Sequence, residues 1–159
     1  MKSEVLKNNK GITLIALIVT IIILLVLSTI AIYTGFDTIR SSKFMAFKTE
    51  MQLLQASIDE YYSSNKDVFN SKGINLTDEQ KNIFTVSEVS NILSSKKENM
   101  ANLQNGFKYY TEDILVNDLQ IEGITRDYFI NIDKRIIISS ELFEYDGINY
   151  YMLEQFEDG

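Results

Sequence analysis

The most restrictive feature of this sequence is an uncharged apolar run close to the N-terminus. No charged side chain occurs in residues 11–36, and Lys10 and Asp37 bracket the run. Residues 12–32 alone number 21, which as a helix span about 30 Å, the hydrocarbon thickness of a bilayer. A secretory signal core is shorter, about 7–15 residues, and ends in a small-residue cleavage site that this run lacks. We therefore expect a transmembrane helix over residues 12–36.

Charge differs sharply between the two sides of this run. Residues 1–11 contain three lysines and one glutamate, net +2, whereas the rest of the chain contains 12 basic and 21 acidic side chains, net −9. Basic residues favour the cytoplasmic side of a span, so we expect a single-pass cytoplasmic membrane protein with its N-terminus in the cytoplasm and its acidic domain outside. Arg40, Lys43 and Lys48 on the far side make this preference modest. An acidic domain repels phosphate backbones, so no nucleic-acid partner is predicted.

The junction between the basic leader and the apolar run carries the most specific signal. Lys10-Gly11 is followed abruptly by "ITLIALIVTIII", which closely resembles the processing and assembly signal of type IV pilins and pseudopilins. The resemblance implies cleavage after Gly11 by a membrane-embedded prepilin peptidase and N-methylation of Ile12. Lys10, Thr13 and Leu14 fit the family's leader-recognition positions. A glycine before the scissile bond is also physically reasonable, because a residue without Cβ lets a protease approach the backbone closely.

Two positions depart from the family pattern. Ile12 stands where the family usually has phenylalanine, and Ala16 stands at the fifth mature position, where the family usually has glutamate. In the family that buried carboxylate is thought to pair with the N-terminal amine of a neighbouring subunit, and an unpaired charge there would be costly. Ala16 cannot form this pair. The resemblance therefore supports processing more strongly than routine polymerisation and favours a minor or tip subunit, of a kind also found among pilin-like proteins of Gram-positive bacteria.

Helical patterning continues beyond the apolar run. Apolar residues recur at spacings of 3, 4, 3, 4 and 3, which places them on one helix face: Phe44, Phe47, Met51, Leu54, Ile58 and Tyr61. Polar residues, among them Glu50, occupy many of the remaining positions, and the chain contains no proline. We expect one long helix whose second half, residues 37–64, packs on its own globular head rather than in a coiled coil.

The head, residues 65–159, combines short helices with strands. Two capping boxes, Thr77 with Gln80 and Thr85 with Glu88, predict helix starts, and another short helix is expected near Thr111. "DYFINIDKRIIIS" and "FEYDGINYYML" each predict a hairpin, the second around an Asp-Gly turn. Together they predict a four-stranded antiparallel meander over residues 128–153 that covers the amphipathic helix. The expected fold is α+β and pilin-like: a leader (1–11), a membrane helix (12–36), its amphipathic continuation (37–64) and the head.

The composition argues against catalysis. The chain contains no cysteine and no histidine, which removes thiolate chemistry, the commonest general base and the commonest metal ligand. No phosphate-binding glycine-rich loop and no GxSxG sequence is present. The carboxylates of the C-terminal part lack the aspartate-rich loop of a calcium site, so they are interpreted as turn formers and a solvated tail: Asp133, Asp146, Glu154, Glu157 and Asp158. We predict a chain that is not an enzyme and needs no cofactor or metal.

The leading hypothesis is a structural subunit of a type IV pilus, a competence pseudopilus or a type II secretion-like filament. Its expected partners are the prepilin peptidase, other pilin or pseudopilin subunits, an assembly platform protein and membrane lipid. The alternative is an uncleaved, single-span protein that presents an extracellular binding domain. The aromatic residues of the expected sheet are interpreted as core and rim rather than as a ligand platform: Tyr128, Phe143, Tyr145, Tyr150 and Tyr151.

Overall fold

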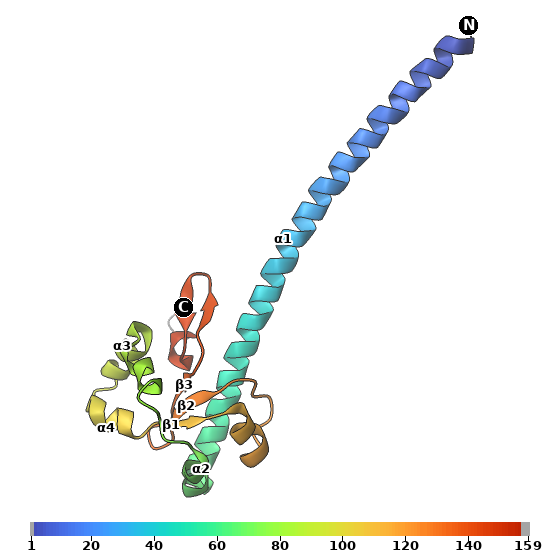
Figure 1. Cartoon of the computed structure of the whole chain (residues 1–159). Helices are drawn as coiled ribbons and strands as arrows, with labels where there is room; N and C mark the ends of the chain where they lie inside the picture. The colour runs from blue at the N-terminus through green and yellow to red at the C-terminus, as the bar shows by residue number, and fades with distance from the viewer. Residues whose placement is uncertain (1, 157–159) are drawn as a thin grey trace. The chain divides into compact units, whose positions relative to one another are not determined.

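A computed structural model describes the backbone of residues 2–156 and the side chains of residues 13–156. The chain divides into two units, residues 1–42 and residues 43–159. Helix α1 (Lys2–Ser64) contributes its first part to one unit and its last part to the other (Figure 1). The long N-terminal helix expected from the sequence is confirmed, and the architecture is α+β.

The second unit contains the remaining helices and all of the named strands. After α1 the helical elements are α2 (Lys66–Lys72), the 3₁₀ helix η1 (Gln80–Thr85), α3 (Ser87–Ser95), α4 (Met100–Asn105), the π-helical turn η2 (Ile114–Asp118) and the 3₁₀ helix η3 (Leu153–Phe156). The short helix expected near Thr111 is present, because η2 begins three residues later and the backbone N–H of Ile114 donates to Thr111 Oγ1.

The strands form two separate antiparallel sheets. One has the order β1-β2-β3 and comprises β1 (Lys108–Tyr110), β2 (Tyr128–Asn131) and β3 (Ile136–Ser139). The other is the hairpin of β4 (Phe143–Tyr145) and β5 (Ile148–Tyr150). Its turn residues Asp146 and Gly147 have φ angles of 50° and 75°, as the tight hairpin turn predicted by the Asp-Gly pair requires.

The expected four-stranded meander is therefore wrong in its pairing, although its four strands lie where the sequence placed them. β2 pairs with the unexpected strand β1 on one side and with β3 on the other. The outer edge of β3 is occupied by the chain after β5, because the backbone N–H of Ser139 donates to the Tyr151 carbonyl at 2.8 Å. β4 turns onto α1 instead, where the ring of Phe143 stacks on that of Phe47.

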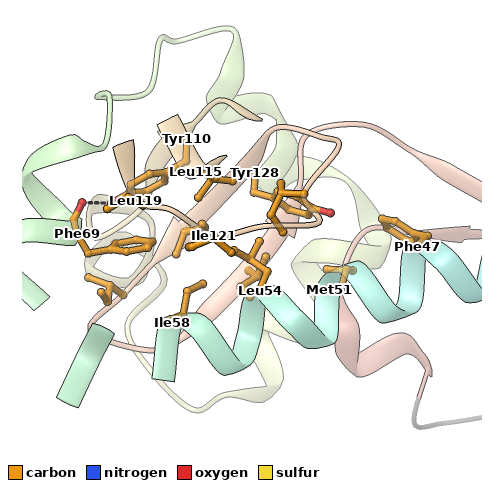
Figure 2. Close-up of a cluster of buried hydrophobic side chains, with 14 of the residues drawn as sticks. Phe47, Met51, Leu54, Ile58, Phe69, Tyr110, Leu115, Leu119, Ile121 and Tyr128 are labelled. Atoms are coloured by element: carbon orange, nitrogen blue, oxygen red, sulfur yellow. Dashed lines mark hydrogen bonds between the residues drawn. The ribbon is translucent and has the colours of Figure 1, made fainter. Parts of the chain in front are cut away.

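The three-stranded sheet is buried on both faces. Alternate residues of a strand point to opposite faces, and Tyr128 and Ile130 of β2 contact the core cluster beneath α1, while Phe129 contacts the second cluster. The first cluster, part of which Figure 2 shows, contains the predicted apolar stripe, which is confirmed as buried at Phe47, Met51, Leu54 and Ile58. The second cluster lies under η1, α3 and α4 and includes Phe84, Val89, Leu93 and Leu103.

Candidate functional site

The apolar part of α1 is the most unusual surface of the first unit. Its large apolar side chains from Leu14 to Phe36 are exposed, and none of its most apolar stretch is buried. Among the described residues, one helix near the N-terminus is long and apolar enough to cross a membrane. Monomeric soluble proteins rarely expose a continuous apolar surface larger than a few hundred Å². This segment therefore needs a lipid or protein environment.

Its hydroxyl groups are compatible with that environment. Each of several hydroxyls donates to a backbone carbonyl three or four residues earlier in the same helix: Thr20, Ser28, Thr29, Thr34 and Thr38. Moving a hydroxyl without a hydrogen-bond partner from water into hydrocarbon costs free energy on the order of several kcal/mol. The hydroxyls are satisfied within α1, so the segment needs no partner side chain for them.

The residues of the predicted cleavage site are only partly described. Lys10, Gly11 and Ile12 lie in α1, but their side chains are outside the described residues, and the peptidase site stays a prediction. Leu14 and Ala16 are exposed on the helix surface. At position 16 the surface of the helix therefore presents a methyl group and no charge.

A buried carboxylate organises the second unit next to the amphipathic part of α1. Glu50 is only 7% exposed. Its Oε1 accepts from the Thr125 backbone N–H at 2.9 Å and from the Tyr128 hydroxyl at 2.8 Å. Its Oε2 accepts from the Thr125 hydroxyl at 2.8 Å and from the Arg126 guanidinium at 3.2 Å. One residue of α1 thus fixes the loop that leads into β2.

Arg126 extends this cluster to the β4–β5 hairpin. Its guanidinium lies 4.9 Å from the ring centre of Phe47 and 5.6 Å from that of Phe143. Burial, and secondarily the negative charge of Glu50, raises the pKa of Tyr128 well above its ordinary value. The tyrosine therefore stays protonated and donates to Glu50, and the arrangement is a structural clamp that joins α1 to the start of β2.

A second polar pair lies in a surface groove of about 480 Å³ beside β1 and η1. The Tyr109 hydroxyl donates to one oxygen of Asp127, and the backbone N–H of Glu112 donates to the other at 2.7 Å. Burial, followed by the hydrogen bond to Asp127, raises the pKa of Tyr109 to about 12. The phenol of Tyr109 is therefore protonated near neutral pH, and both carboxylate oxygens of Asp127 accept hydrogen bonds from within the chain.

The carboxylates singled out in the sequence do not converge. Asp133 pairs with Lys66 at 2.7 Å, Glu154 pairs with Lys96 at 2.8 Å, and Asp146 is exposed in the β4–β5 turn. Glu157 and Asp158 lie outside the described residues. Within residues 13–156 the structure contains no group of three or more histidine, cysteine, aspartate or glutamate side chains that could hold a metal ion. In the same part of the chain, every buried side-chain nitrogen or oxygen has a hydrogen-bond partner.

The predicted aromatic residues occupy the core and its rim. Tyr128 and Tyr150 are buried, whereas Phe143, Tyr145 and Tyr151 are half-buried against the two clusters. This placement confirms the packing interpretation.

The Glu50 clamp was missed by the sequence analysis, which placed Glu50 on the polar face. The helical spacing does indicate that Glu50 lies beside the buried apolar face. Glu50 is three residues after Phe47 and four before Leu54, at the edge of the apolar stripe. A carboxylate at such a position needs donors, and "TRDY" at residues 125–128 supplies them.

In comparisons with protein-family models, with curated proteins and with solved structures, no match to the chain was found.

Proposed function

We propose that this chain is a pilin-like structural subunit that a prepilin peptidase processes and that then enters a type IV pilus or a related secretion or competence filament. The observation that carries the proposal is the fully exposed apolar helix of residues 13–36, preceded by the Lys10-Gly11 junction. Such a surface can be stored in lipid and later packed against protein.

The proposed sequence of events follows from the chemistry of this segment. The peptidase cleaves after Gly11 and methylates the new amino group of Ile12, and residues 12–36 then serve as the membrane anchor. Transfer from lipid into a bundle of similar helices exchanges one apolar environment for another, so close packing between helices must supply the driving force. An assembly platform protein and neighbouring pilin subunits are the partners of this step.

Ala16 favours a minor or tip position in the filament. A subunit with glutamate at this position can pair its carboxylate with a neighbour's N-terminal amine. Because an unpaired charge in hydrocarbon is costly, this pair fixes how far one subunit's helix is shifted along its neighbour's. Ala16 offers no such pair to a neighbour. A terminal subunit has neighbours on one side only and depends least on this interaction.

The polar contacts of the second unit support a structural role for the head. The buried carboxylate of Glu50 in α1 and the Tyr109–Asp127 pair both form hydrogen bonds that join distant segments of the chain. We propose that the head lies outside the cell, as the basic leader favours.

The proposal is tested by the variant Gly11→Asp, expressed in cells with an active prepilin peptidase. The aspartate side chain should block close approach of the peptidase to the backbone, so the chain should keep its leader, whereas wild type should lose 11 residues. Gly11→Ala is the matched control and should be processed at least in part. An uncleaved membrane-anchored binding domain predicts equal masses for wild type and both variants, apart from the substituted side chain.

A further inference from the structure

Within the second unit, an open groove of about 520 Å³ runs along one flank of the amphipathic part of α1. Its helix wall consists of uncharged residues three or four positions apart, which lie on one helix face: Met45, Ala46, Thr49 and Leu53. Its other wall is the loop of residues 123–126. Met45 is 53% exposed. The head therefore presents a mainly apolar surface that its own described residues leave open to solvent.

The Glu50 clamp fixes the two walls of the groove to each other. Glu50 belongs to the lining, and its carboxylate accepts from the backbone N–H and the hydroxyl of Thr125 in the loop at 2.9 and 2.8 Å. A surface that is ordered before binding avoids the entropic cost of ordering it during binding. The groove is therefore formed in the free head.

The free charge at the groove is positive. Lys43 and Arg126 line it, and the exposed ammonium group of Lys43 pairs with no acidic side chain among residues 13–156. The carboxylate of Glu50 also lines the groove, but both of its oxygens accept hydrogen bonds from within the chain. The groove therefore suits a partner segment that is both apolar and acidic.

The β4–β5 hairpin (orange-red in Figure 1) has this character. The hairpin and the two residues before it contain no basic side chain but three exposed carboxylates: Glu141, Glu144 and Asp146. Within the described part of the chain none of the three forms an ion pair. Beside them Leu142 is exposed, and Ile148 is 52% exposed. In apolar character and in charge, the hairpin complements the groove.

We infer that the groove on α1 binds the β4–β5 hairpin of a second copy of this chain. Ile148 of one copy packs against Thr49 and Leu53 of the other. The carboxylate of Glu144 pairs with Lys43 across the contact. Such complementary charges contribute more to the rate and the specificity of association than to its affinity.

The two surfaces differ, so the contact is heterologous. A heterologous contact that does not close into a ring generates an open helical assembly, which is the form of a filament. The inference rests on the proposed function and names the surfaces through which neighbouring heads meet. A terminal copy uses one of its two surfaces and leaves the other free, which agrees with a tip position.

The contact is expected to be weak between isolated chains. A groove of about 520 Å³ admits few side chains, and interfaces that bury less than about 1,200 Å² are typically transient. Chains held side by side by another contact have a much higher effective concentration, which makes a weak contact persistent. The experiment must therefore trap the contact.

The chain contains no cysteine, so single introduced cysteines can trap it as a disulfide. We would mix full-length Thr49→Cys with full-length Ile148→Cys in detergent under mild oxidation. Mixed dimers are identified by mass spectrometry of the linked peptides. We predict that Thr49→Cys gives at least roughly five times more mixed dimer than the control Val68→Cys, because Val68 is equally exposed, at 51%, but lies in α2.

Charge variants test the recognition itself. Adding Lys43→Glu to the Thr49→Cys chain should lower the yield of mixed dimer roughly two- to fivefold. Adding Glu144→Lys to the Ile148→Cys chain should then restore it, because the pair is re-formed with its charges exchanged. Circular dichroism of each variant checks that the head is folded. A yield that the first change leaves unaltered, or that the second fails to restore, overturns the inference.

The remaining outcomes separate the contact from the proposed function. Equal yields with Thr49→Cys and Val68→Cys overturn the inference, and the groove then has a different partner. Thr49→Cys that links to itself as readily as to Ile148→Cys also overturns it, because the contact is then isologous. A chain that loses its leader but forms no mixed dimer overturns the inference alone. A chain that forms the mixed dimer but keeps its leader beside active peptidase supports the contact and overturns the proposed function.

Discussion

At position 50 a single carboxylate accepts hydrogen bonds from three residues that lie more than 70 positions later in the chain. Replacing Glu50 by alanine leaves the Arg126 guanidinium and the Tyr128 hydroxyl without this acceptor. We expect Glu50→Ala to lower the free energy of unfolding of the head by about 3 kcal/mol. Glu50→Gln keeps the shape and one acceptor oxygen and should cost less, about 1–2 kcal/mol.

Urea unfolding of the full-length protein in detergent, followed by circular dichroism, measures these differences. Glu60→Ala is the matched control, because Glu60 is an exposed glutamate of the same helix and its loss should change the free energy by less than about 0.5 kcal/mol. Equal destabilisation by Glu50→Ala and Glu60→Ala would contradict the clamp.

The buried tyrosines predict the alkaline limit of stability. Burial raises the pKa of Tyr110 and Tyr128 above the ordinary value of about 10. Both stay protonated in the folded protein, whereas the unfolded chain ionises them above pH ~10. Their stabilisation is fully present below that pH and is lost above it, by about 1.4 kcal/mol per pH unit for each tyrosine until its folded pKa is reached.

A pH series of urea unfolding experiments should therefore show a falling free energy above pH ~10, with a smaller slope in Tyr128→Phe. The ultraviolet absorbance of phenolate provides the second readout. If all nine tyrosines of the chain ionise together while the circular dichroism stays native, the interpretation is wrong.

Among the secondary-structure elements, the two predicted capping boxes had different outcomes. The Thr77 backbone N–H donates to Gln80 Oε1 at 2.9 Å, and the Gln80 N–H donates to Thr77 Oγ1 at 3.2 Å, so the first box is confirmed. The second did not form, since Thr85 Oγ1 donates to the Asn82 carbonyl, and α3 begins at Ser87 without a side-chain cap.

This difference gives a paired prediction. Thr77→Ala removes an acceptor from the start of η1 and should cost about 1 kcal/mol. Thr85→Ala removes only a hydroxyl that donates to a nearby carbonyl and should cost less than about 0.5 kcal/mol. Thermal unfolding midpoints of the two variants compare them directly, and an equal or reversed order would show that the box does not stabilise the head.

The elements predictable from sequence are those specified by residues close together in the chain. The amphipathic stripe, the Asp146-Gly147 hairpin and the Thr77 box each depend on a local spacing, and each is present. Strand partners depend on distant residues: β1 pairs with β2, and the edge of β3 is occupied by Tyr151. No local pattern indicates these choices.

At the scale of the whole molecule, the proposed processing site follows from the sequence, whereas the exposed apolar helix and the buried core follow from the structure. The Lys10-Gly11 junction is a linear pattern of a few residues. Its proposed meaning, recognition by a prepilin peptidase, depends on these residues and not on the fold. The structure adds that residues 13–36 form a fully exposed apolar helix and that the head has a buried core of its own. The sequence shows that Glu50 borders the apolar stripe, but it does not show which residues donate to Glu50, because these donors lie more than 70 positions later in the chain.

The central claim is that this chain is matured as a pilin-like subunit. Intact mass and N-terminal sequencing of the membrane-extracted protein, from cells with and without the prepilin peptidase, test it most directly. We predict a chain that begins at Ile12 and carries one added methyl group when the peptidase is present, and an unprocessed chain when it is absent. A chain that still begins at Met1 beside active peptidase would contradict the account.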